Sequence, residues 1–350
     1  MLKKITLAVS ATLVSLLCIT SSVPAQAAGI SLSGKGSSFA NGALQACIAS
    51  YPTDSPTYVS TGSGTGRTEF ANGFVDWAAT DAPYTSGAPS KSYVTVPLIG
   101  GPIVFAYSAV GVGDGLQLTP EVVSAILKGD ITRWDDARIK ASNPRIKLPK
   151  KAIKVAYRAS GSGTNTNLTN YLSQTVGGWV KGSNDMVAAS GGIASNSTSF
   201  ANSQLLAAYI EDNANAFGYF DLSDAVVADV AIAKLKNAAG AFVAPTASAA
   251  GRFINAQKPV VSASDATNGT LNIDFTKVVT GAYQLSIVTY GLAPKRAATV
   301  KVSTGEGLAI QNWFKYIVNT CMPAKGATLG YAPIGGSLKT SALNQIKLIG

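Results

Sequence analysis

The tetrapeptide Gly-Ser-Gly-Thr occurs twice in this sequence, at residues 62–65 and again at residues 161–164. Each copy precedes a stretch that we expect to be helical. Glycines let backbone N–H groups approach a ligand closely, Ser and Thr hydroxyls add donors, and a following helix directs its positive end to the same point. Two such loops are suited to holding one anion, such as phosphate, from two sides. Ordinary loops have the same composition, so chance repetition is the alternative.

A carboxylate lies close in sequence to the first copy. Asp81 occupies a turn of small residues before Pro83. A carboxylate repels most anions, but it accepts a hydrogen bond from an anion that carries a proton, as hydrogen phosphate does and sulfate does not. Asp81 is therefore a candidate selectivity residue. A turn acceptor or a helix cap is the alternative role for such an aspartate.

Arg158 stands a few residues before the second copy, within reach of an oxyanion held there. Its planar guanidinium can bind two oxygens at once, whereas a surface ion pair is its alternative role. Ser38 and Phe39 lie at the start of a helical stretch that runs through Cys47. They offer a hydroxyl and a backbone N–H to the same anion, and helix capping explains them equally well.

The composition excludes several kinds of chemistry. The chain contains no histidine, so Ser-His-Asp and Cys-His catalysis and His-based zinc sites are excluded. It has no dense Asp/Glu cluster for a two-metal site, and its Ser and Thr hydroxyls have no evident base. We therefore expect a binding protein rather than an enzyme, with no catalytic residue, no metal and no cofactor.

The formal net charge of +10 produces a positive field that attracts anions. The basic residues are dispersed rather than clustered, which argues against nucleic acid as a partner. With 350 residues and 47% hydrophobic content, the chain can bury one large core or two ordinary ones. We expect a globular monomer.

The N-terminus is typical of an exported protein. Lys3 and Lys4 precede an apolar run over 5–19, and Ala25-Gln26-Ala27 forms a small-x-small cleavage site. We therefore expect residues 1–27 to be a signal peptide, because the run is too short and too close to the terminus for a membrane span. Cys18 raises the alternative of a lipid anchor, but the bulky Leu17 before it argues against lipidation.

Cleavage would leave Cys47 and Cys321. Two cysteines in an exported chain fit one disulfide, although their separation in sequence does not show that they lie close together.

Short β-rich runs alternate with helical stretches along the chain. We expect strands over 57–60, 94–98, 103–108 and 153–156, and helices over 119–127 and 165–174. Thr119 followed by Pro120 marks the start of the first of these helices. The pattern predicts an α/β fold in which strand, glycine-rich turn and helix place a ligand at the ends of parallel strands.

Several motifs occur in one order from about residue 33 to residue 349. They are Gly36-Ser37-Ser38-Phe39, Gly62-Ser63-Gly64, Ala79-Thr80-Asp81-Ala82-Pro83, Gly129 to Asp136, Arg158 to Thr164, Ala216 to Tyr219 and Gly330 to Ile334. With this series the chain resembles the phosphate-binding proteins of bacterial phosphate ABC transporters. The resemblance implies a type II periplasmic binding protein fold, in which two α/β lobes joined by a hinge close on dehydrated phosphate. It also implies delivery of phosphate to permease subunits at the membrane.

Carried over residue by residue, the resemblance implies that phosphate contacts Ser38, Phe39, Ser63, Asp81, Arg158, Ser162, Gly163 and Thr164. Phe39 would act through its backbone N–H. The same resemblance implies a first lobe of residues 28–104 and 288–350 and a second lobe of residues 105–287. Both Cys47 and Cys321 then fall in the first lobe, which favours a disulfide between them.

The chain departs from the family pattern two residues after Arg158. Family members often have an acidic residue there, which would orient the guanidinium, whereas this chain has Ser160. We therefore expect the affinity, the pH dependence or the selectivity against sulfate to differ from the family pattern.

Two other functions remain open from the sequence. One is a phosphohydrolase that uses the same fold. The other is a binder of a different oxyanion, or a surface adhesin, which the basic charge of the chain permits.

Overall fold

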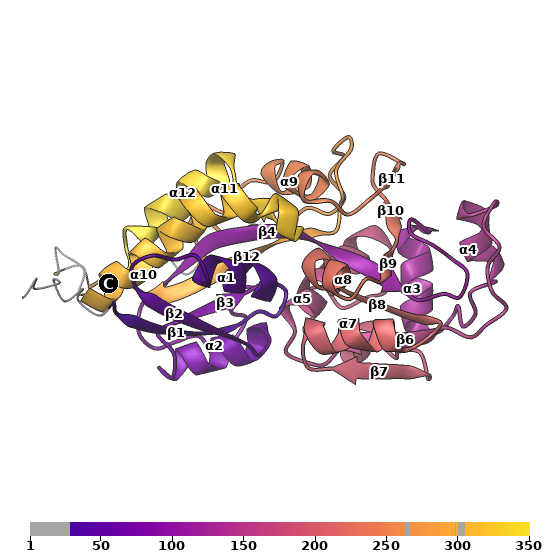
Figure 1. Ribbon diagram of the computed structural model, residues 1–350, viewed down its shortest axis with the longest axis horizontal. Helices are drawn as coiled ribbons and strands as arrows, with labels where there is room; N and C mark the ends of the chain where they lie inside the picture. The colour runs from indigo at the N-terminus through magenta and orange to yellow at the C-terminus, as the bar shows by residue number, and fades with distance from the viewer. Residues whose placement is uncertain (1–28, 263–266, 298, 300–304) are drawn as a thin grey trace, which may run out of the picture.

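The computed structural model describes residues 29–262, 267–297, 299 and 305–350. The expected signal peptide over 1–27, with Cys18, lies outside the described residues. Figure 1 shows two bodies side by side, each with its own strands and helices. We call the body that contains β1, β2 and β3 the first half and the body that contains β6, β7 and β8 the second half.

The first half is built on parallel strands whose carboxyl ends meet at one edge. β1 (Ser31–Gly36) lies between β2 (Ser55–Ser60) and β3 (Trp77–Thr80) and pairs in parallel with both. Three short segments therefore leave the sheet close together. They begin at Ser37, Thr61 and Asp81, and they carry the site residues of this half.

The second half repeats this arrangement. β6 (Lys154–Arg158) pairs in parallel with β7 (Ser197–Phe200) and β8 (Ala216–Asp221). β6 therefore ends at Arg158, and the second Gly-Ser-Gly-Thr loop leads from it into α5 (Gly163–Thr175). In the first half, the corresponding loop leads from β2 into α2 (Ser63–Ala71). Both glycine loops thus precede helices, as predicted.

In Figure 1 the C-terminal helices and α2 lie on opposite sides of the sheet of the first half. The remaining helices are α1 (Asn41–Ile48), α3 (Pro120–Lys128), α4 (Ala137–Ser142), α6 (Met186–Ser190), α7 (Ser203–Asp212), α8 (Leu222–Val227), α9 (Ala247–Asn255), α10 (Gly305–Tyr316), the π-helical η1 (Ile317–Cys321), α11 (Met322–Lys325), η2 (Ala327–Leu329) and α12 (Gly336–Ile346). The remaining strands are β4 (Tyr93–Tyr107), β5 (Gln117–Leu118), β9 (Ala231–Ile232), β10 (Lys234–Lys236), β11 (Phe242–Val243), β12 (Ser286–Pro294) and β13 (Ala332–Pro333).

The long strand β4 belongs to both halves. It pairs with β12 as far as Pro102 and with β8 from Ile103 onward. The sequence predicts a break between strands over 94–98 and 103–108, and this prediction is wrong. The intervening glycines admit close packing instead, since a Cβ on Gly100 would lie 2.7 Å from Ile254 Cδ1 and one on Gly101 would lie 3.0 Å from Phe39 Cζ.

The predicted helix over 119–127 is α3. Its N-cap is Thr119, whose side chain accepts a hydrogen bond from the Val122 N–H, and Pro120 is its first residue. Such a start satisfies one amide that has no partner inside the helix. The helix ends at Lys128 and is capped by Gly129, which has the left-handed conformation that favours glycine.

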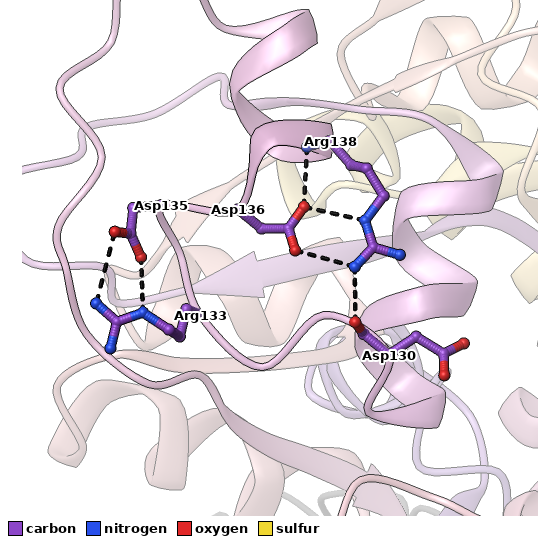
Figure 2. A network of polar contacts seen from close by, with 5 residues as sticks. All are labelled: Asp130, Arg133, Asp135, Asp136 and Arg138. Carbon is purple, nitrogen blue, oxygen red and sulfur yellow. Dashed lines mark hydrogen bonds and ion pairs between the residues drawn. The ribbon is translucent and has the colours of Figure 1, made fainter.

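The motif from Gly129 to Asp136 supports α4 rather than the candidate site. Trp134 is fully buried, and Asp136 accepts a hydrogen bond from the Arg138 N–H at the start of α4. Figure 2 shows Arg138 bridging Asp136 and the carbonyl of Asp130, at 2.9 and 2.6 Å. Figure 1 places α4 at the end of the second half that is remote from the first half. Its exposed ion pairs contribute little stability.

The predicted disulfide between Cys47 and Cys321 is confirmed. It joins α1 to η1, and its Cα atoms lie 5.6 Å apart. The two cysteines are 274 residues apart in the sequence and belong to a buried core that also includes Trp77 and Trp313.

Within the described part of the chain, no helix has the length and apolar character needed to cross a membrane.

Replacing Cys47 and Cys321 together by alanine should lower the free energy of unfolding by about 3 kcal/mol, because the crosslink restricts the unfolded chain. Urea unfolding of the oxidised wild type, the reduced wild type and the double variant measures this loss. The reduced wild type and the variant should unfold at similar urea concentrations. Equal midpoints for all three proteins would show that the bond adds no stability.

Candidate functional site

The two Gly-Ser-Gly-Thr loops contact each other across the two halves. The Gly64 N–H donates a hydrogen bond to the Gly161 carbonyl at 2.8 Å. Gly62 and Gly161, the first residue of each copy, have φ values of 91° and 89°, which disfavour residues with a side chain. The two copies of the tetrapeptide therefore meet in one structural contact.

Close approach explains the other glycines of the pair. A Cβ on Gly163 would lie 2.4 Å from Ser63 Oγ and 2.9 Å from Asp81 Cβ. A Cβ on Gly64 would lie 2.7 Å from the Gly161 carbonyl oxygen. These positions have ordinary backbone conformations, so packing between the two halves excludes larger residues there.

Asp81 follows β3 and is buried, with 4% of its surface exposed. Its Oδ1 accepts hydrogen bonds from Ser37 Oγ at 2.6 Å and Thr289 Oγ1 at 2.7 Å, and its Oδ2 accepts one from Ser63 Oγ at 3.0 Å. Burial raises the pKa of Asp81 above its usual value, and these donors oppose the rise. The Asp81 side chain therefore forms part of a buried polar site, and it does not cap a helix.

Arg158 ends β6 and is 2% exposed. Its Nη1 donates to Ser38 Oγ at 2.8 Å and to Ser203 Oγ at 3.1 Å, and its Nη2 donates to the Ala201 carbonyl at 2.9 Å. Burial lowers the pKa of its guanidinium, since the charge is removed from water. The alternative of a surface ion pair is wrong, because the guanidinium itself is buried and these partners are uncharged.

The second loop presents donors at the start of α5. Ser162 is the N-cap, and its Oγ accepts a hydrogen bond from the Asn165 N–H at 3.2 Å, which leaves its own proton to be donated. The amides of Gly163 and Thr164 lie in the first turn, where N–H groups have no partner inside the helix. The positive end of the helix dipole reinforces them.

Two buried polar atoms of this region have no hydrogen-bond partner among the described residues. They are Arg158 Nε and Thr164 Oγ1. Buried donors without acceptors are costly, and an anion between β6 and α5 would supply acceptors to both. The two copies also differ in burial, since Thr164 of the second copy is buried and Thr65 of the first is exposed.

Ser38 and Phe39 join the site from the start of α1. Ala40 is the N-cap of α1 and no side chain caps this helix, so the capping role considered for Ser38 is wrong. Instead, Ser38 Oγ accepts a hydrogen bond from the Ser203 N–H at 3.1 Å as well as from Arg158. The Phe39 ring packs edge-on against Tyr331 and is fully buried, which leaves its backbone as the part that can face a ligand.

The structure thus gathers all eight predicted site residues at the contact between the two halves, and all eight are buried. Sequence reasoning missed Ser37, Ser203 and Thr289. Ser37 stands inside a recognised motif, and Ser203 follows β7, so recognition of that strand would have pointed to it. Thr289 lies inside β12 and carries no signal of its own. Ser160, two residues after Arg158, is exposed. The guanidinium of Arg158 instead donates hydrogen bonds to Ser203 and to the Ala201 carbonyl.

A second set of polar contacts joins the two halves beside Ser38. Gln204 Nε2 donates to the Ser38 carbonyl at 3.2 Å and to Asp224 Oδ2 at 2.5 Å, and Ser60 Oγ donates to Gln204 Oε1 at 2.9 Å. Asp221 lies within 3.1 Å of the Tyr331 hydroxyl, and burial raises the pKa of Asp221 well above its usual value. The two halves are thus joined by the contacts of Gln204 and Tyr331 as well as by the hydrogen bonds of Arg158 and Ser203 to Ser38.

Comparisons with known proteins agree with this architecture. A family model described as a PBP superfamily domain matches residues 22–319. The chain is 29% identical over 283 residues to the phosphate-binding protein PstS of Xylella fastidiosa (strain Temecula1), across 77% of this chain and 74% of that protein. It is 27% identical over 333 residues to the phosphate-binding protein PstS of Methanocaldococcus jannaschii, across 90% and 85%.

Among solved structures, the chain is similar to a high affinity periplasmic phosphate-binding protein, PfluDING, determined with bound phosphate. The TM-score is 0.72 at 19% sequence identity, across 89% of this chain and 92% of that one. The structure therefore defines a type II periplasmic binding protein fold, as predicted, with a buried polar site between two α/β bodies. The chain belongs to the PBP superfamily.

Replacing Gly163 by alanine should separate the two loops, because the added Cβ overlaps Ser63 and Asp81. We expect the affinity for phosphate, the anion implied by the resemblance, to fall by about 30-fold, which corresponds to ~2 kcal/mol of overpacking. Isothermal titration calorimetry measures this affinity.

The matched control for this prediction is Gly113→Ala, since no other described residue beyond its two chain neighbours has a heavy atom within 4 Å of a Cβ placed there. Thermal unfolding of both variants tests whether the folded state persists. Unchanged affinity in Gly163→Ala would contradict the packing argument.

Proposed function

We propose that this chain is an exported, monomeric receptor that binds inorganic phosphate and delivers it to the permease of an ABC transporter. The observation that supports this proposal best is the placement of the buried Asp81 against the second loop, where a Cβ on Gly163 would lie 2.9 Å from Asp81 Cβ. Arg158, α5 and the hydroxyls attract an oxyanion, while a carboxylate selects one that brings a proton. The names of the relatives agree with this substrate.

The phosphate contacts in this proposal are the eight residues named above. Ser38, the Phe39 amide, Ser63 and Asp81 would act from the first half, and Arg158, Ser162, Gly163 and Thr164 from the second. A dehydrated phosphate would receive its hydrogen bonds from both halves, so binding would favour the closed form. The mature protein would therefore open to load or release its ligand.

The moving bodies in this proposal are a first lobe of residues 28–104 and 288–350 and a second lobe of residues 105–287. The exchange of partners along β4 at Pro102 and Ile103 supports a boundary close to residue 104. Hinge bending at such a crossing would separate the two glycine loops. Small-angle X-ray scattering with and without phosphate tests this closure.

Direct titration tests the substrate assignment. The purified chain without its signal peptide should bind phosphate, and sulfate should bind on the order of 10⁴-fold more weakly, because sulfate cannot satisfy the buried carboxylate. The protein should be unfolded and refolded first to remove any phosphate that co-purifies. Equal affinities, or no binding of either anion, would overturn the assignment.

Asp81→Asn should lower the phosphate-to-sulfate affinity ratio by about tenfold or more, the factor that one charge-assisted hydrogen bond supplies. Asparagine fills the same space but can donate to sulfate. Competition titrations at neutral pH measure the ratio. Asp212→Asn, an exposed position at the end of α7, makes the same change in net charge and should leave the ratio unchanged.

A further inference from the structure

Thr289 and Ser37 reach one oxygen of Asp81 from distant parts of the chain. Ser37 follows β1 and Thr289 lies in β12, and both are fully buried. Their hydroxyls donate to Asp81 Oδ1 at 2.6 and 2.7 Å. Neither residue is among those that the resemblance assigns to phosphate.

Each hydroxyl carries a single proton, and the surroundings fix where it points. Ser37 Oγ accepts from the Ala40 N–H at 3.3 Å, so its proton is free to bind Asp81. Two donors use both lone pairs of Asp81 Oδ1. Oδ2 is then the oxygen left for a ligand proton, and it lies beside Ser63, which itself faces Gly163 of the second half.

The charged and titratable groups that face Asp81 come from several elements. Arg158 approaches from β6 and Arg67 from α2, and both favour the ionised carboxylate. Tyr58 from β2 and Tyr290 from β12 have raised pKa values because they are buried, so they stay neutral near neutral pH. Against this background, burial raises the pKa of Asp81, and the Ser37 and Thr289 hydroxyls lower it.

We propose that Ser37 and Thr289 are positioning residues that keep the Asp81 carboxylate ionised and present only its Oδ2 to the bound anion, and thereby determine the pH range over which the site rejects sulfate. The inference rests on the proposed phosphate function. Once protonated, Asp81 becomes a donor, and a fully ionised anion such as sulfate then becomes acceptable. Removing one hydroxyl should raise the pKa of Asp81 further, so protonation begins at a higher pH.

Thr289→Val tests the proposal, since valine keeps the shape of threonine and removes its hydroxyl. Sulfate affinity should be measured between about pH 4.5 and 8.5, a range in which sulfate does not change its charge. In the wild type, sulfate binding should strengthen as the pH falls through the pKa of Asp81. In Thr289→Val, this onset should occur roughly one pH unit higher, the effect of one hydrogen bond to a carboxylate.

Two further variants control the experiment. Thr289→Ser retains the hydroxyl and should restore the wild-type profile, and Ser37→Ala should shift the onset in the same direction as Thr289→Val. A uniform loss of affinity at every pH, without a shift of the onset, would indicate a purely structural role and overturn the inference. Identical profiles for Thr289→Val and the wild type would overturn it as well.

The same measurements separate the two proposals. If the wild type binds neither phosphate nor sulfate, the proposed function fails and the inference fails with it. If the wild type discriminates between the anions and the hydroxyl variants keep its sulfate profile, the inference alone fails. Circular dichroism of each variant shows that any change arises in a folded protein.

Discussion

The burial of Asp81 and Arg158 in one polar site is the constraint on which the rest of this structure depends. Each is almost completely removed from water, and each would be costly to bury alone. They are held by separate sets of hydroxyls and carbonyls rather than by each other. In the proposed function, the guanidinium would attract an oxyanion and the carboxylate would select among oxyanions.

The fold supplies these partners because parallel strands end at a common edge. In each half, a central strand is flanked in parallel by two others, and the loops that follow bring hydroxyls and first-turn amides to one point. The antiparallel strand β12 adds Thr289 from a segment remote in sequence. The sheets therefore provide the rigid support, and the chemistry lies in the short segments at their ends.

The contact between the two halves is too closely packed to accept larger residues at Gly64 and Gly163. Gly64 and Gly163 allow the loops to touch, while hydrogen bonds from Gln204 to Ser38 and from Tyr331 to Asp221 also join the two halves. In the proposed function, a site completed by this contact would couple ligand binding to the relative position of the halves. The same contact shields Asp81 and Arg158 from water. Electrostatic interactions of these two side chains are therefore stronger than they would be at the surface.

The sequence by itself determined the α/β class, the two Gly-Ser-Gly-Thr loops that precede helices and the two cysteines, because glycine-rich turns and helix starts are local features. The eight candidate contacts follow from the family resemblance, and their binding of phosphate stays a prediction. Ser37, Ser203 and Thr289 were missed because hydroxyl side chains are common, and only folding shows which of them meet a buried charge. The continuous strand β4 was missed because its glycines resemble a turn, whereas close packing against Phe39 and Ile254 requires them. Tertiary structure alone decided which donors surround Asp81 and Arg158, since those partners come from strands far apart in the chain and meet only when the two halves pack together.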